Sequence, residues 1–222
     1  MHIIQPKVEV LPIYGDGTGM LRLIELIGRT CYKSEDKITD TSAPNFVEML
    51  IKRGHEAMIE HATISMKWTC DRGVSHEVVR HRLASYAQES TRYCNYGQRG
   101  VAFIEPFFFA PTTEAYKLWE VACHQSEHIY QSLLMLGYTP QEARTVLNNS
   151  TKTEIWITLN IREYRHFLTL RAAKAAHLQM RQNAIPILKY LQSKIPLMFD
   201  DIPYDRDFPI QHEAQVVELE MP

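Results

Sequence analysis

The stretch Arg80-His81-Arg82-Leu83-Ala84-Ser85-Tyr86-Ala87-Gln88-Glu89-Ser90-Thr91-Arg92-Tyr93 lies within a locally cationic part of the sequence. Residues 72–99 contain five arginines and two histidines but only two glutamates, together with three tyrosines and several neutral hydrogen-bonding side chains. Guanidinium groups bind phosphate in a bidentate manner and stay charged at any working pH, so this mixture favours a phosphorylated aromatic ligand. A solvated surface face is an equally open interpretation, because most runs of charge are of that kind.

The residues before this stretch predict a strand and then a helix. Apolar and polar residues alternate over 64–68, which is typical of a half-buried strand that Asp71-Arg72-Gly73 then ends. Ser75 is a candidate N-cap for a helix that continues to Arg80.

The rest of the chain predicts a mixed order of helices and strands. Apolar spacing indicates helices over 20–29, from Ser42 to about Gly54, over 113–136, from Thr139, and from 161 to about 194 with an irregularity at Pro186. Residues 8–13 and 153–159 are strand-like, 15–19 form a turn, and the tail after 196 is mostly extended. We find no repeat and no long linker, so residues 1–222 are expected to form a single α+β domain with a modest sheet flanked by long helices.

Composition and charge exclude several classes of protein. The 222 residues are 45% hydrophobic and 23% charged, as in an ordinary globular protein, and the formal net charge of −2 gives no global positive field toward nucleic acid or an anionic membrane. No apolar run approaches the roughly 18 residues of a spanning helix, and no signal-peptide pattern opens the chain, so a cytoplasmic location is expected. The four scattered cysteines lack a C-x-x-C pair and are predicted to be free thiols.

Two arginines fall on predicted apolar helix faces. On a helical wheel Arg171 lies in the middle of a face formed by Tyr164, Phe167, Leu168, Leu170 and Leu178. Arg144 borders a second face beside Pro140, Ala143 and Leu147. Burying an unpaired charge costs several kcal/mol, so each arginine needs a partner, either an internal carboxylate or a ligand. Two such arginines favour a ligand.

Three further motifs resemble metal-binding or dinucleotide-binding patterns. His124-Gln125-Ser126-Glu127-His128 matches the inverted zinc-protease pattern, but both histidines point away from the predicted buried face of Leu118, Trp119, Ala122, Ile129, Tyr130 and Leu133. His55 and His61 are six residues apart and so lie on different helix faces. Gly15-x-Gly17-x-Gly19 has its third glycine misplaced for a dinucleotide fingerprint. We therefore predict no metal site, and a plain turn at residues 15–19.

Taken as one unit, residues 80–92 resemble the signature R-H-R-x-x-S-x-N-E-x-S-x-R of the flavin-dependent thymidylate synthases, and six fixed positions match. Ala87 and Gln88 replace the usual Asn-Glu pair. The resemblance extends through Gly54-His55-Glu56 with Glu60-His61, Glu142-Ala143-Arg144, and Asn160-x-Arg162 with Phe167-Leu168-x-Leu170-Arg171. It implies the fold of the thymidylate synthase-complementing proteins and a homotetramer whose active sites are assembled from several subunits.

The resemblance also implies two sets of binding residues and one catalytic residue. The flavin set is Cys31, His55, Arg80, His81, Arg82, Gln88, Asn160, Arg162 and His166. The deoxyuridylate set is Glu77, Arg80, Gln88, Glu89, Ser90, Thr91, Arg92, Arg144 and Arg171, with Arg171 catalytic against the uracil ring. Whether Gln88 or its neighbour Glu89 takes the place of the motif glutamate is open. Cys31, Glu77 and His166 stand where the family often has serine, glutamine and asparagine.

The activity implied by the resemblance is reductive methylation of dUMP to dTMP. Methylenetetrahydrofolate gives the one-carbon unit, reduced FAD gives the hydride, and NADPH reduces FAD again, with no membrane or nucleic-acid partner. A permanently charged guanidinium beside the pyrimidine would stabilise negative charge building on the ring, which suits Arg171 for electrostatic activation rather than general-base duty. The alternative is a single-stranded nucleic-acid-binding module that uses residues 72–99 and their tyrosines as a stacking groove.

Overall fold

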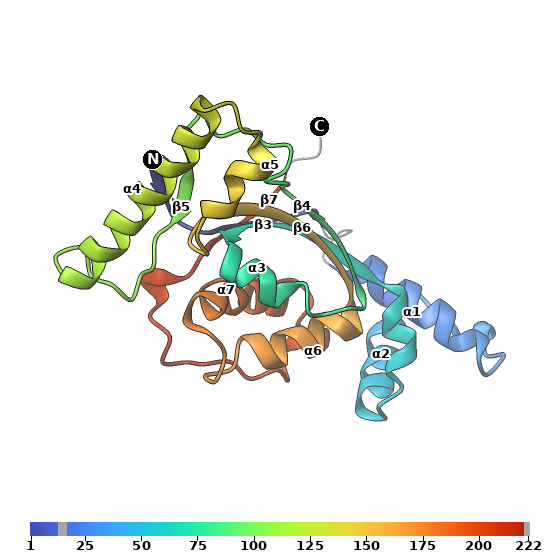
Figure 1. Ribbon diagram of the computed structural model, residues 1–222. Coiled ribbons are helices and arrows are strands. Elements are labelled where there is room, and N and C mark those ends of the chain that lie inside the picture. Colours follow the sequence, from blue (N-terminus) through green and yellow to red (C-terminus); the bar gives the residue numbers. More distant parts are fainter. Residues whose placement is uncertain (13–16, 220–222) are drawn as a thin grey trace. The chain divides into compact units, whose positions relative to one another are not determined.

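The computed structural model describes residues 1–12 and 17–219 (Figure 1). The strands are β1 (His2–Ile4), β2 (Lys7–Val10), β3 (Thr63–Asp71), β4 (Ala84–Gln88), β5 (Ala102–Ile104), β6 (Lys152–Asn160) and β7 (Gln215–Glu218). The α-helices are α1 (Thr18–Thr30), α2 (Ala43–Lys52), α3 (Arg72–Val78), α4 (Glu114–Met135), α5 (Pro140–Ala143), α6 (Ile161–Arg171), α7 (Leu178–Lys194) and α8 (Pro196–Phe199). Short 3-10 helices are η1 (Glu35–Lys37), η2 (Glu56–His61), η3 (Arg144–Val146) and η4 (Ile210–His212).

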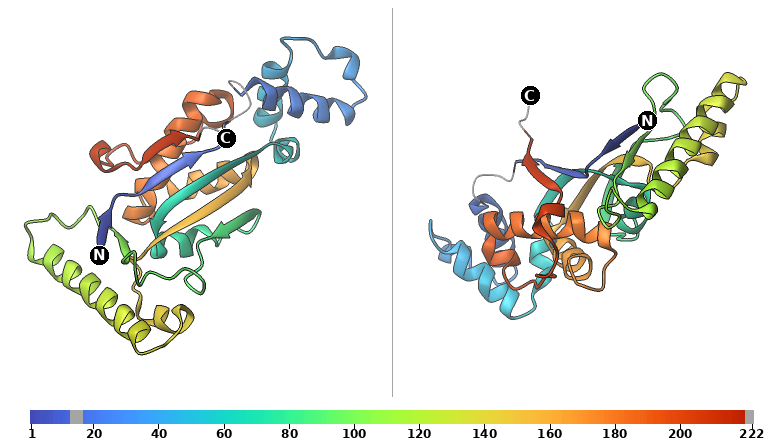
Figure 2. Two further views of the ribbon diagram at one scale, coloured as in Figure 1. Left: turned by 90° about the horizontal axis from the view of Figure 1, so that it is seen from above. Right: turned by 90° about the vertical axis from the view of Figure 1, so that its left-hand side faces the viewer.

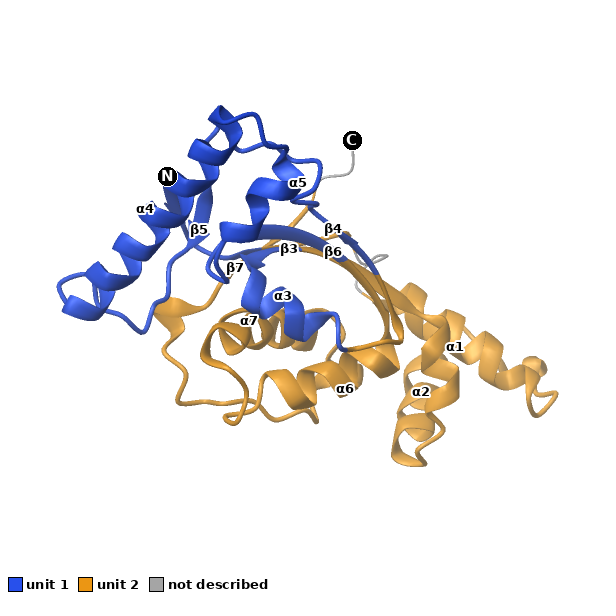
Figure 3. Ribbon diagram, in the orientation of Figure 1, with its two compact units in different colours: residues 1–7, 68–80, 86–156 blue, residues 8–67, 81–85, 157–222 orange. Residues whose placement is uncertain are grey.

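The chain divides into two compact units (Figure 3). Unit 1 comprises residues 1–7, 68–80 and 86–156, and unit 2 comprises residues 8–67, 81–85 and 157–222. Strands β2, β3, β4 and β6 each have residues in both units. The predicted mixture of helices with a modest sheet is confirmed, whereas the single-domain organisation and the homotetramer stay predictions.

A five-stranded sheet has the order β4-β6-β3-β2-β7, and its two longest strands, β3 and β6, lie side by side (Figure 2). Burial alternates along all of β6 and the first part of β3, whereas the last four residues of β3, residues 68–71, are all buried. In β6 every second residue from Thr153 to Leu159 is buried, and in β3 Ile64, Met66 and Trp68 are buried as the sequence predicted. One face of each strand therefore enters a core, which fixes its register.

Unit 1 contains a parallel pair of short strands, β1 and β5, and the long helix α4. The predicted bounds of α4 are confirmed, with Thr113 as N-cap and Gly137 in a left-handed conformation after its end. Its buried face is Cys123, Ser126, Glu127 and Tyr130, so the predicted burial of Leu118, Ala122 and Ile129 is wrong. Glu127 can be buried on this face because its carboxylate accepts a hydrogen bond from the Val101 amide (2.9 Å).

The helix that leads to the Arg80 stretch starts earlier than the sequence predicted. Asp71, not Ser75, is the N-cap of α3, because its buried carboxylate accepts from the Val74 amide at 2.8 Å. The Ser75 hydroxyl instead donates to the Arg72 carbonyl (3.0 Å). A carboxylate at the end of β3 thus caps the helix directly, with no intervening turn.

In unit 2 the predicted continuous helix over 161–194 is two helices, α6 and α7. The interruption at 172–177 is stabilised by the Asp205 amide, which donates to the Ala172 carbonyl at 2.9 Å. Pro186 lies inside α7, and the Gln182 carbonyl that its missing N–H leaves unpaired accepts from the Ala214 amide at 2.8 Å. The helix therefore continues through the proline.

The apolar face predicted for residues 164–178 is partly wrong. Tyr164, Phe167 and Leu168 are buried, but Leu170 is 48% exposed and Leu178 is 37% exposed. Leu178 lies beyond the break, so its position on a continuous wheel does not carry over. Arg171 is the last residue of α6 and is half-buried.

Of the remaining predicted segments, some are confirmed and others lie partly outside the described residues. α1 and α2 are confirmed, as is the capping box of Thr139 and Glu142 at the start of α5, and all four cysteines are free. The turn predicted at 15–19 and the end of the strand predicted at 8–13 lie partly outside the described residues. Among the helices of residues 1–12 and 17–219, none has both the length and the hydrophobicity needed to cross a membrane.

Candidate active site

The two sets of binding residues predicted from the sequence lie largely in different units. Most of the deoxyuridylate set lies in unit 1, and most of the flavin set lies in unit 2 (Figure 3). Arg171, of the deoxyuridylate set, is in unit 2, whereas Arg80 and Gln88, which the flavin set shares, are in unit 1.

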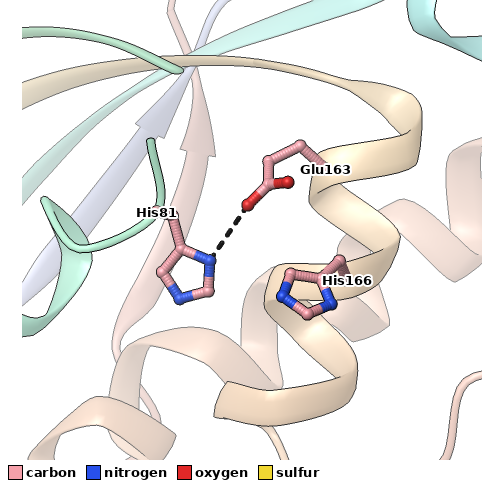
Figure 4. A group of neighbouring side chains, drawn as sticks. All are labelled: His81, Glu163 and His166. Carbon is pink, nitrogen blue, oxygen red and sulfur yellow. Dashed lines mark hydrogen bonds and ion pairs between the residues drawn. The ribbon is translucent and has the colours of Figure 1, made fainter. Parts of the chain in front are cut away.

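In unit 2, His81 lies against α6 and is held by Glu163 (Figure 4). The His81 Nδ1 and a Glu163 carboxylate oxygen are 3.0 Å apart, and both residues are buried. The rings of Phe167 and His166 lie beside the imidazole, with centroids 4.7 and 5.8 Å from it. The loop residue His81 is thus held against one face of α6, which residues 163, 166 and 167 share.

Arg171 donates from its Nε to the His81 Nε2 at 3.2 Å. A guanidinium can only donate, so this nitrogen of His81 is an acceptor and the proton resides on Nδ1, facing Glu163. Burial has the largest effect on the pKa of His81 and lowers it, and nearby Arg171 lowers it as well. The hydrogen bond to Glu163 raises the pKa, but the net shift is downward. His81 is therefore a neutral imidazole at neutral pH.

A pocket of about 510 Å³ lies beside the start of α6 and contains Asn160, Arg162 and His166 of the predicted flavin set. Asn160 is the N-cap of α6 and accepts from the Glu163 amide at 2.8 Å, which leaves its NH₂ group to donate. Arg162 is paired with Glu56 (3.2 Å) and Glu60 (2.6 Å). An anionic ligand here would compete with these carboxylates for the guanidinium.

A second pocket of about 280 Å³ in unit 2 brings His55 and Cys31 together. It is lined by Gly28, Cys31, Tyr32, Leu50, His55, Ala57 and Met58. Gly54 adopts a φ of 69° after α2, and the His55 amide then donates back to the Leu50 carbonyl at 2.9 Å. This glycine-dependent helix end positions His55 at the pocket.

In unit 1, two hydrogen bonds join the 91–92 segment to the residues from α5 to η3. Arg92 donates to Gln141 at 2.8 Å, and Arg144 donates to Thr91 at 3.3 Å. Within the part of the chain that the structure describes, neither arginine forms an ion pair. Their charges are therefore available to an anionic ligand, as the sequence hypothesis required.

Gln88 and Glu89 have different environments in unit 1. Glu89 accepts from Lys152 (3.0 Å), from Tyr96 (2.8 Å) and from the amide of Glu154 (3.2 Å). Gln88 donates its NH₂ group to the hydroxyls of Ser75 (3.0 Å) and Thr153 (3.1 Å). The carboxylate of Glu89 is thus occupied by internal donors.

The other predicted site residues are placed as follows. Arg80 and Arg82 are exposed on either side of His81, and Glu77 is half-buried at the end of α3. Ser90 is half-buried, and its hydroxyl accepts from the Arg92 amide at 3.3 Å.

The aromatic groove required by the nucleic-acid alternative is poorly supported in unit 1. Tyr86 donates its hydroxyl to the Val78 carbonyl at 2.8 Å, and Tyr96 donates to Glu89, so both are half-buried with their hydroxyls turned inward. Tyr93 is 78% exposed. His124 and His128 of the zinc-like motif are exposed on α4, away from its buried face, as predicted.

Sequence reasoning missed Glu163. A glutamate three residues after an asparagine N-cap is typical of a capping box, which hides any other role. The signal that could have found it is its place one turn before His166 and two turns before Arg171 on the same helix. It is also one of three residues, with His81 and His166, whose ligand atoms lie within 4.8 Å of one another.

Comparison with known proteins gives one consistent answer. A sequence model of the family described as thymidylate synthase complementing protein matches residues 16–197. The chain is 35% identical over 197 residues to the flavin-dependent thymidylate synthase of Corynebacterium aurimucosum, covering 81% of this chain and 78% of that one. It is 30% identical over 175 residues to the enzyme of that name from Pyrococcus furiosus, covering 78% of this chain and 72% of that one.

A solved structure supports the fold. The UMP/dUMP methylase PolB from Streptomyces cacaoi, bound with 5-Br dUMP, superposes with a TM-score of 0.70 over 90% of this chain and 96% of that chain. The sequence identity is 22%, so this likeness concerns the fold alone. The family model matched over residues 16–197 and the relatives named above, which are flavin-dependent thymidylate synthases, show that the chain belongs to the thymidylate synthase complementing protein family.

Proposed function

We propose that the protein converts dUMP to dTMP, with methylenetetrahydrofolate as one-carbon donor, reduced FAD as hydride source and NADPH as the reductant of FAD. Its family and the names of its relatives support the flavin-dependent activity. The identities of the folate and of the nicotinamide co-substrate, the homotetramer and the cytoplasmic location are the finer parts of the proposal. The nucleic-acid alternative is set aside.

The residues of unit 2 fit a flavin nucleotide. The pocket beside α6 has a volume within the range of small-molecule sites and offers the Asn160 amide to a polar group, and a flavin phosphate would bind Arg162 in place of Glu56 and Glu60. The smaller pocket, with Met58, Leu50 and Tyr32, suits a flat apolar ring. When bound, reduced FAD supplies the hydride.

Arg171 is the proposed catalytic residue. Its guanidinium donates from Nε to His81, and its two terminal nitrogens carry the other four N–H donors. Methylation at C5 of uracil requires electron density at that carbon, and a fixed cation at the pyrimidine edge would stabilise the negative charge that builds on the ring. We assign Arg171 this electrostatic role, since its proton is effectively permanent.

Arg92 and Arg144 are the proposed phosphate ligands. The hydrogen bonds to Gln141 and Thr91 orient both guanidiniums without neutralising them. A bidentate arginine grip would fix the nucleotide, so part of the rate enhancement would come from orientation. Thr91, Ser90, Glu77, Arg80 and Gln88 are the further proposed nucleotide contacts, and Glu89 is proposed to act through the fold instead.

The reaction requires the pyrimidine and the reduced flavin to meet, so residues of both sets must serve one reacting centre in the working enzyme. We propose that the homotetramer provides this, with active sites assembled from several subunits.

The observation that carries the proposal is the pair of uncompensated guanidiniums, Arg92 and Arg144, in a chain of this family. The test is spectroscopic. The purified protein should be yellow or take up FAD, should bleach on addition of NADPH, and should then form dTMP from dUMP when methylenetetrahydrofolate is supplied. A protein that neither contains nor takes up FAD would contradict the proposal.

A further inference from the structure

Glu163, His81 and Arg171 form a hydrogen-bonded series within unit 2 (Figure 4 shows the first two). We propose that Glu163 is a positioning residue, whose carboxylate fixes the tautomer of His81 and through it the orientation of Arg171. This inference rests on the proposed function, because it gives the catalytic guanidinium a support that the sequence motif does not include. The geometry and the burial of these groups carry it.

The first step concerns the proton of His81. Arg171 donates to Nε2, so Nε2 must present a lone pair. A carboxylate oxygen 3.0 Å from Nδ1 stabilises the proton at that nitrogen. If Glu163 were absent, the Nε2–H tautomer would become accessible, and its N–H would face the Arg171 N–H, donor against donor. The guanidinium would then have to turn away.

The second step concerns the reason for a buried carboxylate at this position. Glu163 is 8% exposed and His81 is 6% exposed, and a buried charge requires a strong partner. Capping of α6 does not need the Glu163 side chain, because Asn160 already accepts from the Glu163 backbone amide. The carboxylate bonds the imidazole of a different segment, 82 residues away in the sequence. Its side chain therefore serves His81.

Glu163, His81 and His166 are close enough to suggest a metal ion, since their ligand atoms lie within 4.8 Å of one another. Two contacts argue for the hydrogen-bonded series instead. The Nδ1 of His81 is engaged with Glu163, and a guanidinium cation occupies the Nε2 side of the ring at 3.2 Å. A second cation at this cluster would be repelled by Arg171.

The groups that face His81 also set its response to pH. Glu163, His166 and Arg171 approach it from α6, and Arg80 and Arg82 flank it in the sequence. Protonation places a hydrogen on Nε2 and breaks the bond from Arg171, so turnover should fall as the pH drops through the pKa of His81. Glu163 raises that pKa, hence Glu163→Gln should move the acid limb to lower pH.

The experiment compares Glu163→Gln with Glu163→Ala in the full-length flavin-loaded enzyme. The amide oxygen of glutamine can still accept from Nδ1–H, so kcat should stay within about threefold of wild type, whereas alanine should lower kcat about 10- to 100-fold, as loss of a carboxylate behind a functional histidine typically does. Because Glu163 also lines the pocket beside α6, FAD affinity is measured in both variants: we expect a change of less than about threefold, and a loss of kcat that follows a loss of FAD would place Glu163 at the flavin and overturn the inference. Glu48→Gln is the control, because Glu48 pairs with Lys52 on the surface of α2.

A direct readout of the tautomer does not depend on activity. Nitrogen-15 NMR of histidine side chains, with His81 assigned by its loss in His81→Gln, should show Nδ1–H in wild type and Glu163→Gln, and a mixture or Nε2–H in Glu163→Ala. A wild-type Nε2–H signal, or a Glu163→Ala enzyme with wild-type kcat, would overturn the inference. If alanine prevents folding, the wild-type tautomer and the acid-limb shift in Glu163→Gln still decide. Wild type that makes no dTMP would instead refute the proposed function.

Discussion

Replacing Glu89 by glutamine should destabilise the fold rather than weaken nucleotide binding selectively. The carboxylate lies among three donors: the ammonium of Lys152 at 3.0 Å, the hydroxyl of Tyr96 at 2.8 Å and the backbone amide of Glu154 at 3.2 Å. Glutamine turns one of the two oxygens into an NH₂ group. With the NH₂ group on the Tyr96 side, the Tyr96 hydroxyl can turn to accept, and the remaining oxygen still accepts from Lys152 and the Glu154 amide, so the charge is what is lost.

The expected magnitude follows from these contacts. The side chains of Glu89 and Lys152 are 16% and 19% exposed, so solvent screens the pair only partly. Hydrogen bonds to charged groups contribute about 1.5–3 kcal/mol each, against about 0.5–1.5 kcal/mol for neutral ones, and all three contacts of Glu89 lose the charge. We expect the free energy of unfolding of Glu89→Gln to fall by about 2–4 kcal/mol.

Urea unfolding followed by circular dichroism, at one fixed protein concentration, measures this difference. Glu154→Gln is the matched control, because its 44% exposed side chain pairs with the same Lys152, and we expect it to cost less than about 1 kcal/mol. Gln88→Glu should be tolerated, since the Thr153 hydroxyl can turn to donate to the new carboxylate while Ser75 keeps its bond to the Arg72 carbonyl. Wild-type stability of Glu89→Gln with weakened dUMP binding would refute the reasoning and place this carboxylate at the nucleotide.

Four further substitutions test other parts of the account. Arg171→Ala should leave FAD bound but remove most turnover, whereas Arg92→Ala should mainly raise the KM for dUMP, and equal loss of FAD from both would contradict this division. A hydrogen bond from Arg165 lowers the pKa of Asp201, so the ion pair stabilises the fold above the unfolded pKa of about 3.9, and this stabilisation is lost as the pH falls through the lower pKa of the folded state. The difference in urea midpoint between wild type and Asp201→Asn should therefore narrow below about pH 4. A difference that stays constant with pH would argue against the ion pair. Gly28→Ala would place a Cβ 2.6 Å from the Phe46 ring, so the free energy of unfolding should fall by about 1–3 kcal/mol and the melting temperature should drop. An unchanged melting temperature would show that the contact between α1 and α2 relaxes.

Local patterns predicted the elements where one signal dominated. The alternation in β6 and the glycine after α4 each specify a single backbone conformation, and both predictions are confirmed. The N-cap of α3 was missed because Asp71 and Ser75 are both good caps, and only the tertiary position of the strand end selects Asp71. The break after Arg171 depends on a carbonyl bonded by Asp205, 33 residues later in the sequence than Ala172, which no local pattern contains.

Long-range partners also limited prediction of the candidate site. The residue types of the Arg80 stretch indicated an anionic aromatic ligand, and the wheel singled out Arg171 as needing a polar partner. That the partner is the imidazole of His81, oriented by Glu163, depends on the packing of a loop against α6. Likewise, the sequence alone left Gln88 and Glu89 as alternatives, and their different environments follow from the position of Lys152 on the neighbouring strand β6.

A single-turnover experiment tests the central claim most directly. The flavin-loaded protein is reduced chemically under anaerobic conditions, freed of reductant, and mixed with dUMP and methylenetetrahydrofolate in the absence of NADPH. The account predicts about one dTMP for each flavin that becomes oxidised, and no flavin oxidation when dUMP is omitted. A flavin that stays reduced while dTMP appears, or that is oxidised without dTMP, would contradict the assignment of the flavin as hydride donor to the pyrimidine.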